Sequence, residues 1–197
     1  WVLNKVDYAL AGTGSAAAVW RQKGYTGPID IIPQFGTDPA LFTASDGQED
    51  ANRPFTIGYA GRLVEEKGVQ VLMQAAAQLQ SIDWRLYLLG GGPYQAQLES
   101  LAKGLGIFDR VIFAGQVRSV DMPAQYRRFD VLVVPSLTRT NWKEQFGRVL
   151  VEAMASGVPV IGSNSGAIPD VIGDAGLIVP EGDAVALAVC LTNLQSD

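Results

Sequence analysis

Two glutamates, Glu144 and Glu152, stand eight positions apart around the predicted start of a helix. The apolar pattern and a following glycine predict this helix from Phe146 or Gly147 to Ser156. Glu152 then lies about five residues inside the helix, roughly 7.5 Å along its axis. Because helical side chains lean toward the N-terminus, we expect both carboxylates near the first turn.

The first turn of this helix is also a predicted anion site. The free N–H groups of residues 147–149 and the helix dipole attract a group such as phosphate. Carboxylates repel phosphate but accept hydrogen bonds from hydroxyls. The pattern therefore suits a diphosphate that carries a hydroxyl-bearing ring on either side, and a nucleotide sugar is such a molecule. The alternative is that Glu144 is a solvated capping residue and Glu152 an exposed helix residue.

Two cations follow another apolar run, in the segment GYAGRLVEEKG at 58–68. Gly61 closes the predicted strand, and Arg62 and Lys67 lie in the short loop before the next helix. Two cations and exposed backbone amides at the carboxyl end of a strand suit a diphosphate. The alternative is that both side chains are solvated beside the two glutamates of the loop.

Two glycine-rich turns offer further phosphate sites. GTGSAA at 12–17 fits a dinucleotide-binding pattern, but the next predicted strand begins with Asp30 and ends at Pro33, which offers no carboxylate to a ribose. A plain strand-to-helix turn is the favoured interpretation. In LLGGGPYQAQL at 88–98, Pro93 is expected at the first position of a helix. Its three glycines permit close approach of a ligand or serve helix-on-sheet packing, and packing is favoured.

The elements that position these residues alternate along the chain. Apolar runs recur at 6–10, 29–33, 55–60, 84–89, 111–114, 130–134, 158–161 and 176–179. Most are nearly continuous, as in strands buried on both faces. Helical spacing of apolar residues predicts helices over 69–79 and 98–105. The alternation predicts an α/β fold, a Rossmann-like doubly wound parallel sheet that binds ligands at the carboxyl ends of its strands.

Residues 36–54 interrupt this pattern with two prolines, four acidic residues and little apolar content. They predict a linker. We accordingly divide the chain into residues 1–40 and 41–197, with the compact part of the second unit starting near residue 53. The sequence begins without methionine and ends within an alanine- and leucine-rich helical pattern, so we expect it to be a segment of a longer protein.

Composition excludes several classes of function. The net charge of −5 provides no basic field for nucleic acid. The chain has no histidine and a single cysteine, Cys190, which excludes a histidine triad, a histidine metal site, a cysteine zinc cluster and an intrachain disulfide. No apolar run approaches the roughly 18 residues of a membrane span. A cytoplasmic protein is therefore expected.

Taken together, these motifs resemble the donor-binding C-terminal domain of retaining GT-B glycosyltransferases of the group 1, or family 4, type. The family's donor motif is a glutamate, seven residues and a second glutamate, seen here as EQFGRVLVE at 144–152. Four further segments resemble, in the family's order, its hinge, phosphate loop, nucleobase loop and sugar-site closure: 29–42, 58–68, 115–126 and 151–172. The similarity covers about residues 4–190.

The resemblance implies a role for each matching residue. Gly61, Arg62 and Lys67 would form the diphosphate site. Glu152 would bond the ribose hydroxyls, and Glu144 would contact the transferred sugar. Backbone groups would complete the donor site, with Val117 and Arg118 framing the base and the amides of Phe146, Gly147, Arg148 and Val149 meeting sugar or phosphate. Glu144, Arg62 and Lys67 would be the catalytic residues, and no metal or other cofactor is expected.

The implied activity is transfer of a sugar from a nucleoside-diphosphate sugar to an acceptor, with retention of anomeric configuration. Residues 1–40 would be the remnant of an N-terminal acceptor domain with its hinge, and the family's final helices would lie beyond residue 197. The expected partners are the nucleotide sugar and that N-terminal domain, through which peripheral membrane contact is possible. Two alternatives stay open on the same fold: a noncatalytic nucleotide-sugar binding module and a sugar-nucleotide epimerase.

Overall fold

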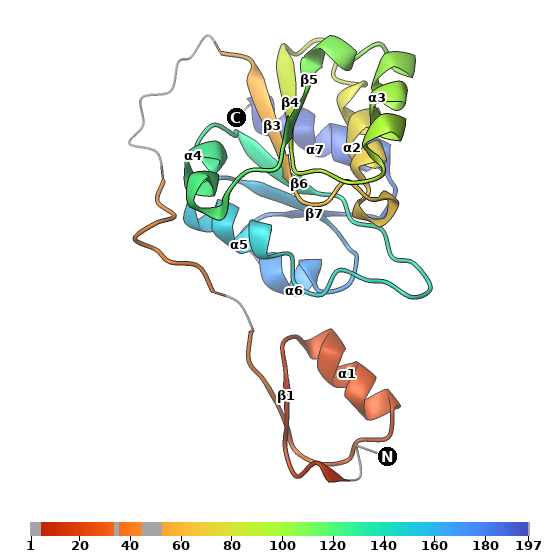
Figure 1. The fold of residues 1–197 in the computed structure, drawn as a ribbon, viewed down its shortest axis with the longest axis vertical. Helices are drawn as coiled ribbons and strands as arrows, with labels where there is room; N and C mark the ends of the chain where they lie inside the picture. The colour runs from red at the N-terminus through yellow and green to blue at the C-terminus, as the bar shows by residue number, and fades with distance from the viewer. Residues whose placement is uncertain (1–4, 34–35, 45–52, 197) are drawn as a thin grey trace.

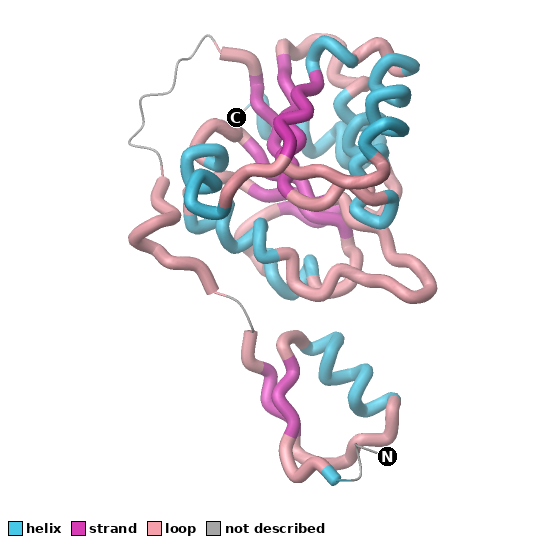
Figure 2. Tube along the Cα trace, viewed as in Figure 1, coloured by secondary structure: helices cyan, strands magenta, loops and turns pink. Residues whose placement is uncertain are grey.

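The computed structural model describes residues 5–33, 36–44 and 53–196, which contain two parallel sheets (Figures 1 and 2). In the smaller sheet β1 (Ala9–Ala11) pairs with β2 (Ile29–Ile31), and α1 (Gly14–Gln22) connects them. The Thr13 hydroxyl caps α1 by accepting the N–H of Ala16 at 3.1 Å. GTGSAA thus forms an ordinary capped strand-to-helix turn.

The larger sheet has six parallel strands in the order β5-β4-β3-β6-β7-β8. The strands are β3 (Phe55–Ala60), β4 (Trp84–Leu89), β5 (Val111–Gly115), β6 (Val131–Val134), β7 (Val160–Ser163) and β8 (Leu177–Val179). Numbered within this sheet alone, the order is 3-2-1-4-5-6, which is that of a doubly wound Rossmann-like sheet. The predicted fold class is confirmed.

Helices cover both faces of the larger sheet (Figure 1). One face carries α2 (Val69–Ala76), α3 (Gln95–Gly104) and α7 (Ala184–Ser196), and the other carries α4 (Met122–Tyr126), α5 (Arg148–Ala155) and α6 (Ile168–Ile172). Short 3-10 turns lie at η2 (Glu65–Lys67), η3 (Phe108–Arg110) and η4 (Ser119–Asp121). The α2 helix is shorter than predicted, and α3 begins after Pro93 rather than at it.

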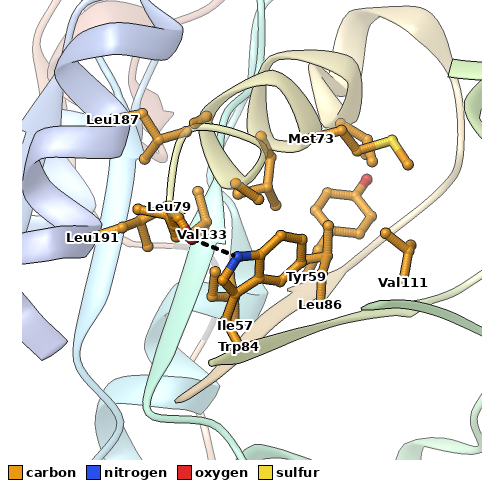
Figure 3. Close-up of a cluster of buried hydrophobic side chains, with 14 of the residues drawn as sticks. Ile57, Tyr59, Met73, Leu79, Trp84, Leu86, Val111, Val133, Leu187 and Leu191 are labelled. Atoms are coloured by element: carbon orange, nitrogen blue, oxygen red, sulfur yellow. Dashed lines mark hydrogen bonds between the residues drawn. The ribbon is translucent and has the colours of Figure 1, made fainter. Parts of the chain in front are cut away.

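The core beneath α2, α3 and α7 centres on Trp84, whose side chain is 1% exposed (Figure 3). Its indole N–H donates to the carbonyl of Leu79 at 3.2 Å, so the buried polar group is satisfied. Ile57 and Leu86 from β3 and β4 pack beside it. Alternate strand residues point into this core and into the opposite one, which explains the nearly continuous apolar runs.

The predicted linker is partly anchored. Phe42 is buried beneath the second helical layer, with its ring centroid 6.1 Å from that of Tyr126 in α4. Of residues 36–44, Phe42 therefore reaches the core of the six-stranded unit. Residues 45–52 of the predicted linker lie outside the described residues. The division of the chain at residue 40 stays a prediction.

Candidate functional site

A cavity of about 330 Å³ lies where the strand order reverses, at the carboxyl ends of the central strands. Connections from the two strands at such a point run in opposite directions and leave a crevice. The loops after β3, β4 and β5 and the start of α5 form the walls. Six predicted donor residues line the cavity: Gly61, Arg62, Val117, Arg148, Val149 and Glu152.

The wall formed by the loops after β3 and β4 depends on glycine. A Cβ at Gly90 would lie 1.9 Å from the carbonyl oxygen of Gly61, and Gly90 has a φ of +131°. Gly90 and Gly91 also line the cavity. The glycine run therefore brings two loop backbones together, rather than a helix onto the sheet, and places its own backbone at the cavity. The buried Tyr59 hydroxyl donates to the carbonyl of Arg62 at 2.7 Å and holds the first loop.

Glu152 lies one turn inside α5 and is only 7% exposed. Its Oε2 accepts the hydroxyl of Tyr126 at 2.7 Å, and its Oε1 pairs with Nε of Arg148 at 2.9 Å. The expectation of an exposed helix residue is wrong, because α4 covers this side of α5. Burial and then the bond to Glu152 raise the pKa of Tyr126, so its hydroxyl stays protonated.

Glu144 is likewise buried, at 8% exposure, and is not a solvated capping residue. Its Oε2 accepts the ammonium of Lys67 at 2.6 Å and the hydroxyl of Ser136 at 3.0 Å. The Lys67 ammonium also lies 5.1 Å from the ring centroid of Trp142. Two predicted catalytic residues, from loops 77 positions apart, thus form one ion pair.

The α5 helix begins at Arg148, because Gly147 at its N-cap takes the left-handed conformation with a φ of 74°. The helix ends at Ala155, one residue before the predicted Ser156. Arg148 and Val149, in the first turn of α5, line the cavity together with the loops after β3 and β4, so the unpaired first-turn amides border it. Arg62 and the start of α5 thus give one cavity two sources of positive potential.

A second cavity, of about 560 Å³, lies beside Glu144. One wall is the β1–α1 turn with α1, and the other includes Glu144, Phe146 and Gly166. The carbonyl of Glu144 accepts the N–H of Ala167 at 2.9 Å, which joins this loop to the one after β7. Glu144 therefore lines the second cavity and also holds the Lys67 ammonium.

The remaining predicted residues differ in position. Arg118 is exposed, pairs with Asp121 at 2.7 Å and lines neither cavity, whereas its neighbours Val117 and Ser119 line the first one. Within residues 5–33, 36–44 and 53–196, no group of three His, Cys, Asp or Glu side chains is arranged to hold a metal ion. In the same described ranges, no helix combines the length and the apolar character that crossing a membrane requires.

Sequence reasoning missed the residues that hold the two glutamates. Ser136 follows β6 and Tyr126 ends α4, and both side chains are fully buried. Each meets its glutamate through the tertiary fold, so no local spacing identifies it. The only signal is a polar atom in a segment whose apolar pattern predicts burial, since buried polar groups need partners.

The sequence pattern described as "Glycosyl transferases group 1" matches residues 54–197. A GDP-mannose-dependent alpha-(1-6)-phosphatidylinositol monomannoside mannosyltransferase of Mycobacterium tuberculosis is 38% identical over 170 residues, which are 84% of this chain and 44% of that protein. The chain spans less than half the length of the curated relatives it matches.

Solved structures show the same fold. The C-terminal domain of a glycosyl transferase group 1 family protein of Francisella tularensis has a TM-score of 0.70 and 31% identity, covering 82% of this chain and 89% of that one. The Anabaena protein HepE in complex with UDP-glucose has a TM-score of 0.83 and 25% identity, covering 98% of this chain and 55% of that one.

Proposed function

The chain belongs to the group 1 glycosyl transferases, and on that basis we propose that it forms the donor-binding half of an enzyme that transfers a sugar from a nucleoside diphosphate to an acceptor. The observation that carries the proposal is the cavity at the reversal of strand order. Arg62, the start of α5 and a buried Glu152 converge there, with the Lys67–Glu144 pair next to them. The HepE complex with UDP-glucose and the GDP-mannose-dependent relative support a nucleotide-sugar donor.

Each part of the site then has a role. Arg62, Lys67 and the N-terminus of α5 stabilise the negative charge of the departing diphosphate, which is the main contribution to catalysis. Glu152 accepts hydrogen bonds from the ribose, and Glu144 accepts one from the transferred sugar. For Lys67 to reach a phosphate, its ammonium has to share or leave its bond with Glu144. We also propose that no metal is required and that anomeric configuration is retained.

The acceptor is proposed to bind to another domain of the whole protein, facing the cavity beside Glu144. This chain then binds nucleotide without transferring sugar, because the closed cleft that holds the acceptor and excludes water is incomplete. Localisation in the cytoplasm, with peripheral membrane contact through that domain, stays a prediction.

Thermal unfolding with millimolar UDP, GDP and ADP, each with and without magnesium, tests the proposal. A ligand that binds only the folded chain stabilises it by RT ln(1 + [L]/Kd), about 2.7 kcal/mol at a hundredfold excess over Kd. We expect one diphosphate to raise the unfolding temperature equally with and without magnesium. No shift with any of the three would contradict the proposal.

Glu152→Ala and a matched control assign the effect to the cavity. Loss of hydrogen bonds to a charged group is expected to weaken nucleotide binding by about 1 to 3 kcal/mol. Glu99→Ala makes the same change in α3, where Glu99 is half-buried and accepts a hydrogen bond from Gln95, and should leave nucleotide binding unchanged. Incubation with nucleotide sugar and no acceptor separates the epimerase alternative, which releases an epimerised sugar.

A further inference from the structure

Tyr126 is the last residue of α4, and its side chain is fully buried. Its ring packs against two others, with centroids 6.1 Å from Phe42 and 6.3 Å from Phe129. The ring is therefore held both by a nearby residue, Phe129, and by Phe42 from a distant part of the chain. Such packing leaves the hydroxyl little freedom to point elsewhere.

The hydroxyl of Tyr126 meets Oε2 of Glu152 at 2.7 Å, in a buried contact. An ionised carboxylate only accepts, so the tyrosine is the donor. Burial strengthens this charge-assisted bond and makes its loss costly. The raised pKa of Tyr126 keeps the donor proton in place at neutral pH.

The other oxygen of Glu152 has a different partner. Oε1 pairs with Arg148, whose side chain is 56% exposed, whereas that of Glu152 is 9% exposed. Oε1 therefore lies on the solvent side and Oε2 on the protein side. Arg148 and Glu152 line the donor cavity and also an adjoining cavity of about 270 Å³ formed with residues 36–42 and the η4–α4 segment. An exposed guanidinium can move aside at little cost when a ligand hydroxyl approaches Oε1.

We infer that Tyr126 is a positioning residue for nucleotide recognition: its buried hydroxyl fixes the Glu152 carboxylate so that Oε1 faces the ribose hydroxyls. This inference rests on the proposed function. A carboxylate held at one oxygen presents the other in a single orientation. A ribose hydroxyl then meets a prepared acceptor, and less conformational entropy is lost on binding.

Tyr126→Phe removes one oxygen and keeps the ring that packs against Phe42 and Phe129. The matched control is Tyr25→Phe, since Tyr25 is also buried and its hydroxyl donates to the carbonyl of Pro28 in the smaller unit. Calorimetric titration measures the Kd of each variant for UDP, GDP and ADP. It is repeated with the 2′,3′-dideoxy analogue of each diphosphate that binds, which lacks the hydroxyls that Oε1 would accept.

We expect Tyr126→Phe to weaken binding of the ribonucleotide by about 3- to 10-fold, part of the effect of a hydrogen bond to a charged group. Binding of the dideoxy analogue should change by less than about twofold, because the cycle isolates the coupling between the protein hydroxyl and the ligand hydroxyls. Tyr25→Phe should change neither. A merely structural role would weaken both ligands equally.

The outcomes separate the inference from the proposal beneath it. If Glu152→Ala weakens ribonucleotide binding but Tyr126→Phe does not, the inference is overturned and the proposed function stands. Equal losses for ribonucleotide and dideoxy analogue in Tyr126→Phe also overturn it. If none of the three diphosphates binds the unaltered chain, the proposed function and the inference fail together.

Discussion

The ion pair between Lys67 and Glu144 allows a quantitative test of how the two loops of the site are held together. Replacing Glu144 by alanine removes the acceptor of two donors, the Lys67 ammonium at 2.6 Å and the Ser136 hydroxyl at 3.0 Å. Ser136 is fully buried, and the side chain of Lys67 keeps 23% of its exposure. Both donors lose their partner, but only Lys67 can turn toward water.

Breaking a buried pair by removing one partner costs about 3 to 5 kcal/mol. Because Lys67 is partly exposed, we reduce this to about 2 to 3 kcal/mol for Glu144→Ala, a fall in unfolding temperature of roughly 4 to 12 °C for a chain of this size. Lys67→Met removes the charge and keeps the stem. The double variant should be more stable than the sum of the two losses predicts, with a coupling of about 1 to 2 kcal/mol.

Urea unfolding, followed by far-UV circular dichroism so that the contact of Trp142 with Lys67 does not affect the signal, measures all four proteins of the cycle. As a control, Asp83→Ala breaks the surface pair with Arg85, which is 3.7 Å long and has side chains 71% and 39% exposed, and should cost about 0.5 kcal/mol or less. Additive losses in the Lys67 and Glu144 variants would show that the two side chains do not interact in solution.

Three further predictions concern the framework of the site. Burial and then the charge of Glu144 raise the pKa of Tyr59 above that of an unfolded tyrosine, which is near 10. This difference in pKa stabilises the folded chain fully below the unfolded pKa. The stabilisation is lost as pH rises toward the folded pKa. Between pH 8 and pH 11 the free energy of unfolding, measured with urea, should fall by about 1.4 kcal/mol less in Tyr59→Phe than in the unaltered chain. Equal falls in the two proteins would contradict this. Gly90→Ala should lower the free energy of unfolding by more than about 2 kcal/mol. The control Gly104→Ala, where a Cβ meets nothing within 4 Å, should be neutral or stabilising. Similar values for the two variants in urea unfolding would argue against the close approach of the loops after β3 and β4. Glu181 accepts both the N–H and the hydroxyl of Thr138, the latter at 2.7 Å, and so restrains the loop after β6. Glu181→Ala should therefore speed tryptic cleavage after Lys143 in this loop. An unchanged cleavage rate on gels would show that the bonds to Glu181 do not restrain the loop.

Much of the sheet could be predicted because its strands are buried on both faces. Such strands are continuous apolar runs with clear ends, and β3 and β4 have the bounds that the sequence predicts. The end of α2 was less predictable. Leu79 continues the helical spacing and is buried, but it lies in a turn after Ala76, where its carbonyl accepts the indole N–H of Trp84. Apolar spacing reports burial, and a tertiary contact can bury a residue outside the helix.

The site was predictable only where its geometry is local. The position of Glu152 near the start of α5 follows from helical geometry, and its pair with Arg148 is an ordinary i, i+4 contact. The bond from Tyr126 and the pairing of Glu144 with Lys67 join residues 26 and 77 positions apart. These contacts depend on how the loops meet at the edge of the sheet, and a single sequence carries no direct signal of that meeting.

The anchoring of Phe42 has a consequence for recombining this chain with its relatives. The ring contacts Tyr126, which in turn bonds Glu152, so Phe42 forms part of the support behind the cavity that Glu152 lines. A chimera joined after residue 44 would take the residue at position 42 from a relative and the cavity lined by Glu152 from this chain. A junction placed before residue 36 keeps the anchor and the cavity from one parent, and under the proposed function the transplanted half should then carry the nucleotide preference of that parent.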